Sequence, residues 1–283
     1  MMLLSEILSM KKTILFLLST MLMLHVYAQT PDTIQLQKEI TLQLPAGDGI
    51  RSGAVVWDPS SKHYYAPIAG GADRLLAVFN VRGKKISNDT LKTLFDVRGI
   101  WYVPSLKTLC ANGANDNGWI SYVMNSDDNP QSTNLLFIGM NQPDEQSVGV
   151  FNDKENVVYF LKGQHIASYN FATGELLSDT MRLHVGSANQ INAYSNADED
   201  DENTTPTNYN YTSVVYTGLP GTEFGLLNVI KKRIELYDKN SGYVTKVLSL
   251  PEDAEPDAML CFSYTNKMYW LFDSAKRAWI GYK

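Results

Sequence analysis

The chain has 283 residues, of which 44% are hydrophobic and 11% aromatic, and it carries a formal net charge of −6. This length suits one large domain with a sizeable core. The negative charge, together with the lack of any cluster of lysine and arginine, speaks against nucleic acids and anionic membrane surfaces as partners.

The first residues have the pattern of an export signal. Two lysines precede an apolar stretch over residues 13–24, and the residues up to Ala28 are typical of a signal-peptide cleavage site. We therefore predict a signal peptide over residues 1–28, cleaved after Ala28, and a periplasmic or secreted protein. The apolar stretch is short for a membrane span, although an uncleaved anchor is the alternative, and no later segment is expected to span. Residues 29–283 are expected to form a single domain.

After this segment, a unit of strands recurs five times. Each copy opens with a short apolar run, continues with a turn rich in Pro, Gly, Asn or Asp, and then has a second apolar strand. The opening runs begin near Gly53, Gly99, Ser147, Thr212 and Ala258. A recurring unit of this kind predicts a β-propeller, in which each copy forms one blade.

The third strand of three copies carries the clearest internal signature. In residues 76–84, 166–175 and 234–243, an aromatic residue is followed by Asn or Asp and then, three or four residues on, by Gly. The Asn or Asp side chain accepts local backbone hydrogen bonds, and the glycine supplies a positive φ. Each segment is therefore expected to end in a tight hairpin.

The two ends of the repeat suggest how the ring closes. The fifth copy stops before a fourth strand, while residues 33–44 alternate polar and apolar side chains. We predict that this segment lies beside residues 277–282 as the outer strand of the last blade. The fold class expected is thus all-β, a five-bladed propeller closed by the N-terminal strand. A β-sandwich is the alternative, and the polar segment 184–210, expected to be an acidic loop insertion, leaves a sixth blade possible.

The strand and turn pattern over most of residues 33–283 resembles the broad NHL/YVTN/quinoprotein-like group of secreted propellers. Asn170 to Gly174 and Asp238 to Gly242 carry the likeness best. The resemblance implies the propeller fold. It brings no family-defining catalytic motif, so it assigns no catalytic residue.

Cys110 and Cys261 invite a disulfide because the protein is expected to be exported. The blade assignment opposes this bond, since it places them in the second and fifth blades, which are not neighbours in a ring of five. The two Cα atoms should then be too far apart to bridge. We predict two buried free thiols.

Polar side chains recur just ahead of the inner strands, on the loop-rich face where propellers usually meet their ligands. These candidate ligand-binding residues are Asp48, Arg51, Asp96, Arg98, Asp144, Gln146 and Asp257. Strands that converge on the axis should gather them around one opening, where carboxylates and arginine forks suit a polar or sugar-like ligand. Alternatively, they pair with one another and line a wet channel.

Trp119 directly follows the turn-forming run 115–118. An aromatic side chain beside a loop of the ligand face can stack on a sugar or a partner, so Trp119 completes the list of candidates. Trp57 and Trp101 fall within inner strands and are expected to lie in the core.

The sequence gives little support for metal binding, nucleophilic catalysis or phosphate binding. The four histidines are scattered without metal-ligand spacing, and no nucleophile elbow or phosphate-cradling loop is present. The acidic run 196–203 lacks the spacing of a calcium loop and is expected to be a solvated insertion. We therefore expect no metal and no cofactor.

The function expected is that of an exported binding or scaffold protein, a monomer that recognises a protein or glycan through its loop-rich face. The alternative is a glycoside hydrolase or lyase that uses two carboxylates at the axis. That enzyme would need two carboxyl groups roughly 5 to 10 Å apart.

Overall fold

The structure, a computed structural model, describes residues 31–47, 49–185 and 206–283. All the strands of the described ranges belong to one compact unit, Asp32–Lys283. The predicted signal peptide, Asp48 and most of the acidic insertion fall outside the described residues. Within them, no helix has the length and apolar character needed to cross a membrane.

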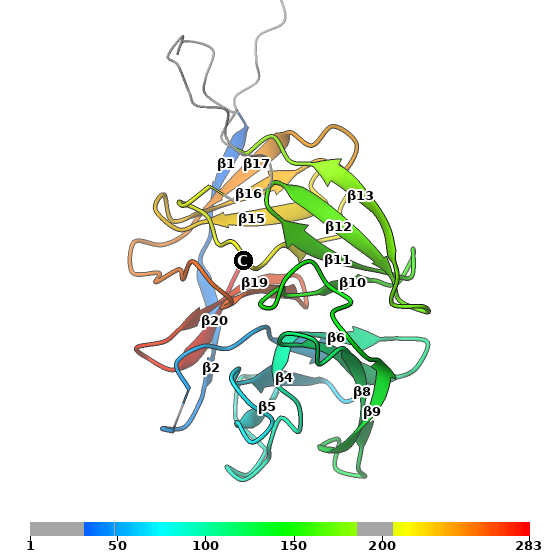
Figure 1. The fold of residues 1–283 in the computed structure, drawn as a ribbon. Coiled ribbons are helices and arrows are strands. Elements are labelled where there is room, and N and C mark those ends of the chain that lie inside the picture. The colour runs from blue at the N-terminus through cyan, green and yellow to red at the C-terminus, as the bar shows by residue number, and fades with distance from the viewer. Residues whose placement is uncertain (1–30, 48, 186–205) are drawn as a thin grey trace, which may run out of the picture. The chain divides into compact units, whose positions relative to one another are not determined.

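The strands form five sheets, each antiparallel through its consecutive strands (Figure 1). Blade one contains β3 (Val56–Asp58), β4 (His63–Pro67) and β5 (Leu76–Asn80). Blade two contains β6 (Val97–Val103), β7 (Thr108–Gly113), β8 (Trp119–Met124) and β9 (Pro130–Phe137). Blade three contains β10 (Val150–Asn152), β11 (Val157–Lys162), β12 (His165–Asn170) and β13 (Leu176–Arg182).

The last two blades include the N-terminal strands. Blade four contains β14 (Val215–Tyr216), β15 (Phe224–Asn228), β16 (Arg233–Tyr237), β17 (Val244–Ser249) and, at its edge, β1 (Asp32–Gln35). Blade five contains β18 (Phe262–Thr265), β19 (Met268–Asp273), β20 (Ala278–Tyr282) and β2 (Lys38–Gln43). The inner strands contact one another in the cyclic order β3, β6, β10, β14, β18 and back to β3. The predicted five-bladed propeller is confirmed.

The closure differs in part from the prediction. Strand β2 pairs antiparallel with β20 and supplies the missing outer strand of blade five, as expected. Strand β1 instead pairs in parallel with β17 of blade four, so the prediction is wrong for the start of the segment. The chain changes blades at Leu36, whose N–H donates to the Ser249 carbonyl and whose side chain is buried in the core shared by both blades. The N-terminal segment therefore straps two blades together.

The signature of the third strands is confirmed as hairpin chemistry. Asn80 Oδ1 accepts hydrogen bonds from the N–H groups of Arg82 and Lys84, at 3.0 and 3.1 Å. Asp238 Oδ1 accepts one from the Ser241 N–H at 2.7 Å. The glycine of this second turn, Gly242, has a φ of 71°, a value that side chains disfavour.

The two cysteines are free and buried, as predicted. Cys110 lies on β7, and Cys261 directly precedes β18. Burial raises the pKa of both thiols to about 12, because a buried thiolate loses its hydration. Both side chains therefore act as small apolar groups in the core.

Candidate functional site

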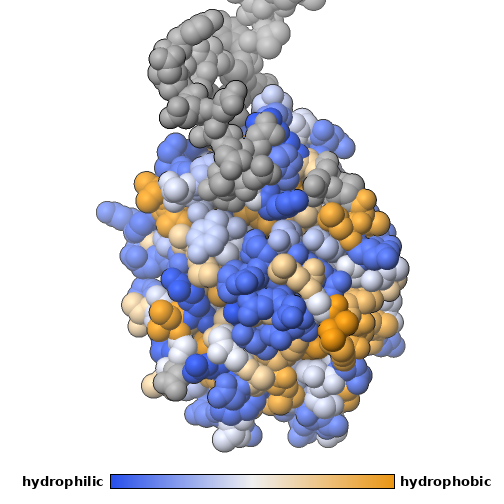
Figure 2. Space-filling model, viewed as in Figure 1, coloured by the Kyte–Doolittle hydropathy of each residue, from blue (hydrophilic) through white to orange (hydrophobic). Residues whose placement is uncertain are grey.

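The polar candidates that the structure describes lie where the chain enters the inner strands. We call Arg51, Asp96, Arg98, Asp144, Gln146 and Asp257 the polar rim. Figure 2 shows hydrophilic residues over the middle of one face of the molecule, with apolar residues nearer its edges. The rim residues have defined partners, which decide what they can do.

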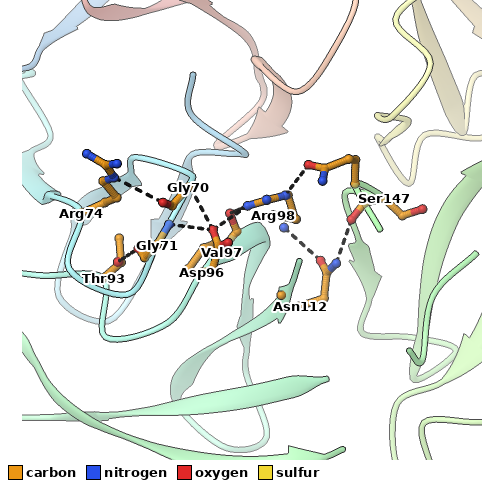
Figure 3. Close-up of polar contacts among 12 residues, drawn as sticks. Gly70, Gly71, Arg74, Thr93, Asp96, Val97, Arg98, Asn112 and Ser147 are labelled. Atoms are coloured by element: carbon orange, nitrogen blue, oxygen red, sulfur yellow. Dashed lines mark hydrogen bonds and ion pairs between the residues drawn. The ribbon is translucent and has the colours of Figure 1, made fainter. Parts of the chain in front are cut away.

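Arg98 is the centre of the largest rim cluster (Figure 3). Its Nη1 lies 2.6 Å from Asp96 Oδ1, and its Nε donates to Gln146 Oε1 at 2.7 Å. The same Asp96 oxygen accepts the N–H groups of Gly70 and Gly71, at 2.8 and 3.0 Å. The Arg98 side chain is only 8% exposed. The cluster thus joins a loop of blade one to the entries of blades two and three.

The remaining rim residues also have partners within the protein. Arg51 Nε lies 3.3 Å from Asp257 Oδ2, across the junction of blades one and five. Asp144 is exposed, and its Oδ1 accepts the backbone N–H of Gln146 at 2.8 Å. Four rim charges therefore pair with one another, as Arg51 with Asp257 and Arg98 with Asp96, which is the alternative that the sequence left open, whereas Asp144 accepts a backbone N–H. Ligand binding by these residues stays a prediction, and the two carboxylates that face arginines are already occupied.

Asn112, which the sequence did not single out, forms a second network beside this cluster (Figure 3). It is fully buried on β7. Its Oδ1 accepts the N–H groups of Gly99 and Gly149, at 2.9 and 3.0 Å, while its Nδ2 donates to Gln142 Oε1 at 2.6 Å and to the Ser147 carbonyl at 2.8 Å. A Cβ on Gly99 would lie 2.4 Å from the same Oδ1, so this glycine is needed for the close approach. Asn112 thereby connects the inner strands of blades two and three.

Trp119 has a different place from the one expected. It is fully buried at the start of β8, and its ring packs among aromatic side chains. The contacting rings are Trp101, Phe137, Phe160, Tyr169 and Phe171, with centroids 5.6 to 6.4 Å away. The strand begins directly after the turn and pairs Trp119 with Asn112, which directs the ring into the core between blades. The prediction of an exposed stacking aromatic is wrong.

A cavity of about 170 Å³ lies among the inner strands of all five blades. Each blade contributes one half-buried aromatic side chain to its lining. We call these five residues the aromatic collar: Trp57, Tyr102, Phe151, Tyr216 and Tyr264. The expectation that Trp57 lies in the core therefore holds only in part, whereas Trp101 is buried, at 4% exposure.

The collar residues occupy equivalent positions in the repeat. Each sits near the end of the inner strand, in the last or next-to-last residue pair before the turn to the second strand. The pairs are Trp57 with Tyr64, Tyr102 with Leu109, Phe151 with Val158, Tyr216 with Phe224 and Tyr264 with Tyr269. On β6, Tyr102 follows the rim residue Arg98 by four positions, which corresponds to about 13 Å of strand. The rim and the collar therefore lie at opposite ends of the inner strands.

The cavity carries no formal charge. Its lining contains no Asp, Glu, Lys, Arg or His. Its serine and threonine hydroxyls have backbone partners, because Ser263 Oγ donates to the Val55 carbonyl at 2.9 Å and Thr265 Oγ1 accepts the Trp57 N–H at 3.0 Å. Burial raises the pKa of Tyr216 and of Tyr264, so both phenols stay neutral at physiological pH. Across the described ranges, no cluster of three or more His, Cys, Asp or Glu could hold a metal ion.

Comparison with known proteins supports the fold. No protein-family model and no curated protein matches the sequence. Among solved structures, the chain is similar to the glutaminyl cyclase of Myxococcus xanthus, with a TM-score of 0.54 and 7% identity, over 89% of this chain and 97% of that one. At this identity, the likeness shows a shared propeller-type fold alone.

Proposed function

We propose that this protein is an exported binding protein that receives its ligand in the axial cavity. The ligand is a small organic molecule or a group projecting from a protein or glycan partner. The observation that carries the proposal is the aromatic collar, which surrounds the cavity with one half-buried ring from each blade. Aromatic side chains in a concave site supply large contact areas at low entropic cost, so they commonly dominate binding.

The state of the polar rim supports the same choice. A ligand bound at Arg98 would have to replace contacts that this nearly buried side chain already makes with Asp96 and Gln146. Breaking a buried ion pair leaves a poorly solvated charge, which is costly. The collar rings are only half-buried, so a ligand can contact them without displacing an ion pair. The proposal therefore moves the ligand from the loop-rich face to the opposite end of the axis.

Export remains part of the proposal. The signal peptide expected over residues 1–28 would deliver the protein to the periplasm or the outside of the cell. The cavity lining has no carboxylate or imidazole, and the pKa values of Tyr216 and Tyr264 are raised by burial, which also favours binding over acid–base chemistry.

Calorimetric titration tests the proposal with three probes of different chemistry, namely choline, glucose and 3,3-dimethylbutan-1-ol. We expect at least one probe to bind, to lose most of its affinity in Trp57→Ala, and to keep it in Arg51→Gln. Arg51→Gln is the matched control, because it alters the rim and leaves the cavity lining unchanged. Failure of all three probes to bind, or binding that needs Arg51 and not Trp57, would refute the axial site.

A further inference from the structure

We propose that the group held by the aromatic collar is a methylated ammonium, as in the head group of choline. This inference rests on the proposed function and specifies its ligand. It follows from what the cavity lining offers to each class of ligand and from what it lacks.

Anions find no partner in the lining. A carboxylate or phosphate buried there would need cationic side chains to offset its charge, and the lining has no Lys, Arg or His. The formal charge of −6 on the chain adds a general repulsion. The cavity therefore selects against negatively charged ligands.

Sugars are also poorly matched. Each hydroxyl that a sugar buries needs a hydrogen-bond partner, and the polar side chains that usually provide one are Asp, Glu, Asn, Gln and Arg. The lining has none of these, and the hydroxyls of Ser263, Thr265 and Tyr102 already have partners in the protein. The remaining side-chain hydroxyls, the phenols of Tyr216 and Tyr264, are too few to satisfy most hydroxyls of a sugar.

A quaternary ammonium suits the same lining. It has no N–H group, so it needs no hydrogen-bond acceptor, and its methyl groups bury apolar surface against aromatic carbons. Its positive charge is attracted to the negative faces of Trp, Tyr and Phe rings. Five such rings line the cavity, and no formal charge among the lining residues competes with them for the cation.

The collar is held in place by the blades behind it. Four of its rings pack on further aromatic rings: Trp57 on Tyr64 at 4.5 Å, Tyr264 on Tyr269 at 4.8 Å, Phe151 on Phe171 at 5.0 Å and Tyr216 on Tyr159 at 5.2 Å. The Tyr102 hydroxyl lies 2.6 Å from Ser60 Oγ, in the turn of the neighbouring blade. Rings fixed in this way lose little entropy when a ligand enters, which favours binding.

The decisive experiment compares two probes of the same shape. Choline and 3,3-dimethylbutan-1-ol differ only in the central atom, N⁺ in the first and carbon in the second. We expect calorimetry on the full-length protein to give a choline Kd at least about tenfold lower than that of the neutral probe. Equal or tighter binding of the neutral probe, or preferred binding of glucose, would overturn the inference.

A matched pair of variants locates the effect. Tyr264→Phe keeps the ring, whereas Tyr264→Leu keeps an apolar side chain without a π face. We expect choline affinity to stay within about threefold in Tyr264→Phe and to fall about tenfold in Tyr264→Leu, while the neutral probe changes less than about threefold in both. Equal losses of both probes in Tyr264→Leu would show that shape, and not charge, is recognised.

The two proposals fail in different ways. If both probes bind equally and both are lost in Trp57→Ala, the axial site stands and the choice of a cation is wrong. If no binding depends on the collar, both proposals fall. Urea unfolding of each variant, followed by circular dichroism, shows that a lost affinity does not come from a lost fold.

Discussion

The polar rim and the aromatic collar lie at opposite ends of the same inner strands, yet their side chains are used in opposite ways. At the rim, Arg98 is 8% exposed and has Asp96 and Gln146 as partners. At the collar, Tyr102 and its counterparts are half-buried and line a cavity. The charged residues hold the blades together, while the aromatic residues keep surface free for a ligand.

Polar residues gathered at a propeller axis therefore do not by themselves form a binding site. Asp96, Arg98 and Gln146 belong to one network, in which Arg98 contacts both of the other side chains. The contacts of this network stabilise the fold. A substitution at the rim should therefore alter stability more than binding, and one at the collar should do the reverse.

The largest effect is expected for Asn112→Ala. The substitution leaves the buried N–H groups of Gly99 and Gly149 without an acceptor and removes the partner of Gln142. Each unsatisfied buried group costs about 1–3 kcal/mol, so we expect the free energy of unfolding to fall by about 3–5 kcal/mol. Urea denaturation followed by tryptophan fluorescence measures the change.

The control for this variant is Asn134→Ala. Asn134 is exposed on β9, so its truncation should change the free energy of unfolding by about 0.5 kcal/mol or less. Similar effects of the two substitutions would mean that Asn112 does not connect blades two and three.

A smaller effect is expected within the rim itself, from Arg98→Gln compared with Arg51→Gln. Arg98 is nearly buried beside Asp96, so its loss should cost about 2–4 kcal/mol. The side chain of Arg51 is 40% exposed, so its pair with Asp257 should contribute about 1 kcal/mol or less. A costlier loss of Arg51, measured by the same denaturation, would reverse this order within the rim.

A smaller effect on stability than that of Asn112→Ala or Arg98→Gln is expected at the collar. Tyr264→Leu keeps apolar volume at a half-buried position and loses the ring contact with Tyr269. Such a contact contributes about 1 kcal/mol, which sets the expected decrease in the free energy of unfolding. A loss as large as that of Asn112→Ala would show that the collar, too, serves the fold.

The fold could be predicted from the sequence because its determinants are local. The Asn or Asp followed by Gly, as at Asn80 and Asp238, specifies a hairpin within ten residues, and the structure has these turns. The strap was predicted only in part. Whether β1 pairs with blade four or blade five depends on where Leu36 is buried, and the alternating pattern of the segment does not contain that information.

The candidate site was harder to predict because it depends on register. Trp57, Phe151 and Tyr216 end the apolar runs that mark their inner strands, which was the available signal. In blade five, the run suggested a strand from Ala258, but Leu260 and Cys261 have φ values of 55° and 60°, and β18 begins at Phe262. Because the strand begins later than the apolar run, the sequence does not show that Tyr264 is equivalent to the other four collar residues. The partners of Arg98 depend on contacts between blades, which no local pattern reveals.

The most direct test of the account follows the five tryptophans by ¹⁹F NMR after labelling with 5-fluorotryptophan. Trp119, Trp270 and Trp279 are buried outside the cavity lining, Trp101 is buried but belongs to the lining, and Trp57 is half-buried and lines the cavity. With the Trp57 signal assigned from Trp57→Phe, we expect choline to shift that signal and to leave the Trp119 signal in place. If choline leaves the chemical shift of Trp57 unchanged, or shifts the Trp119 signal instead, the result would contradict an axial site lined by the collar.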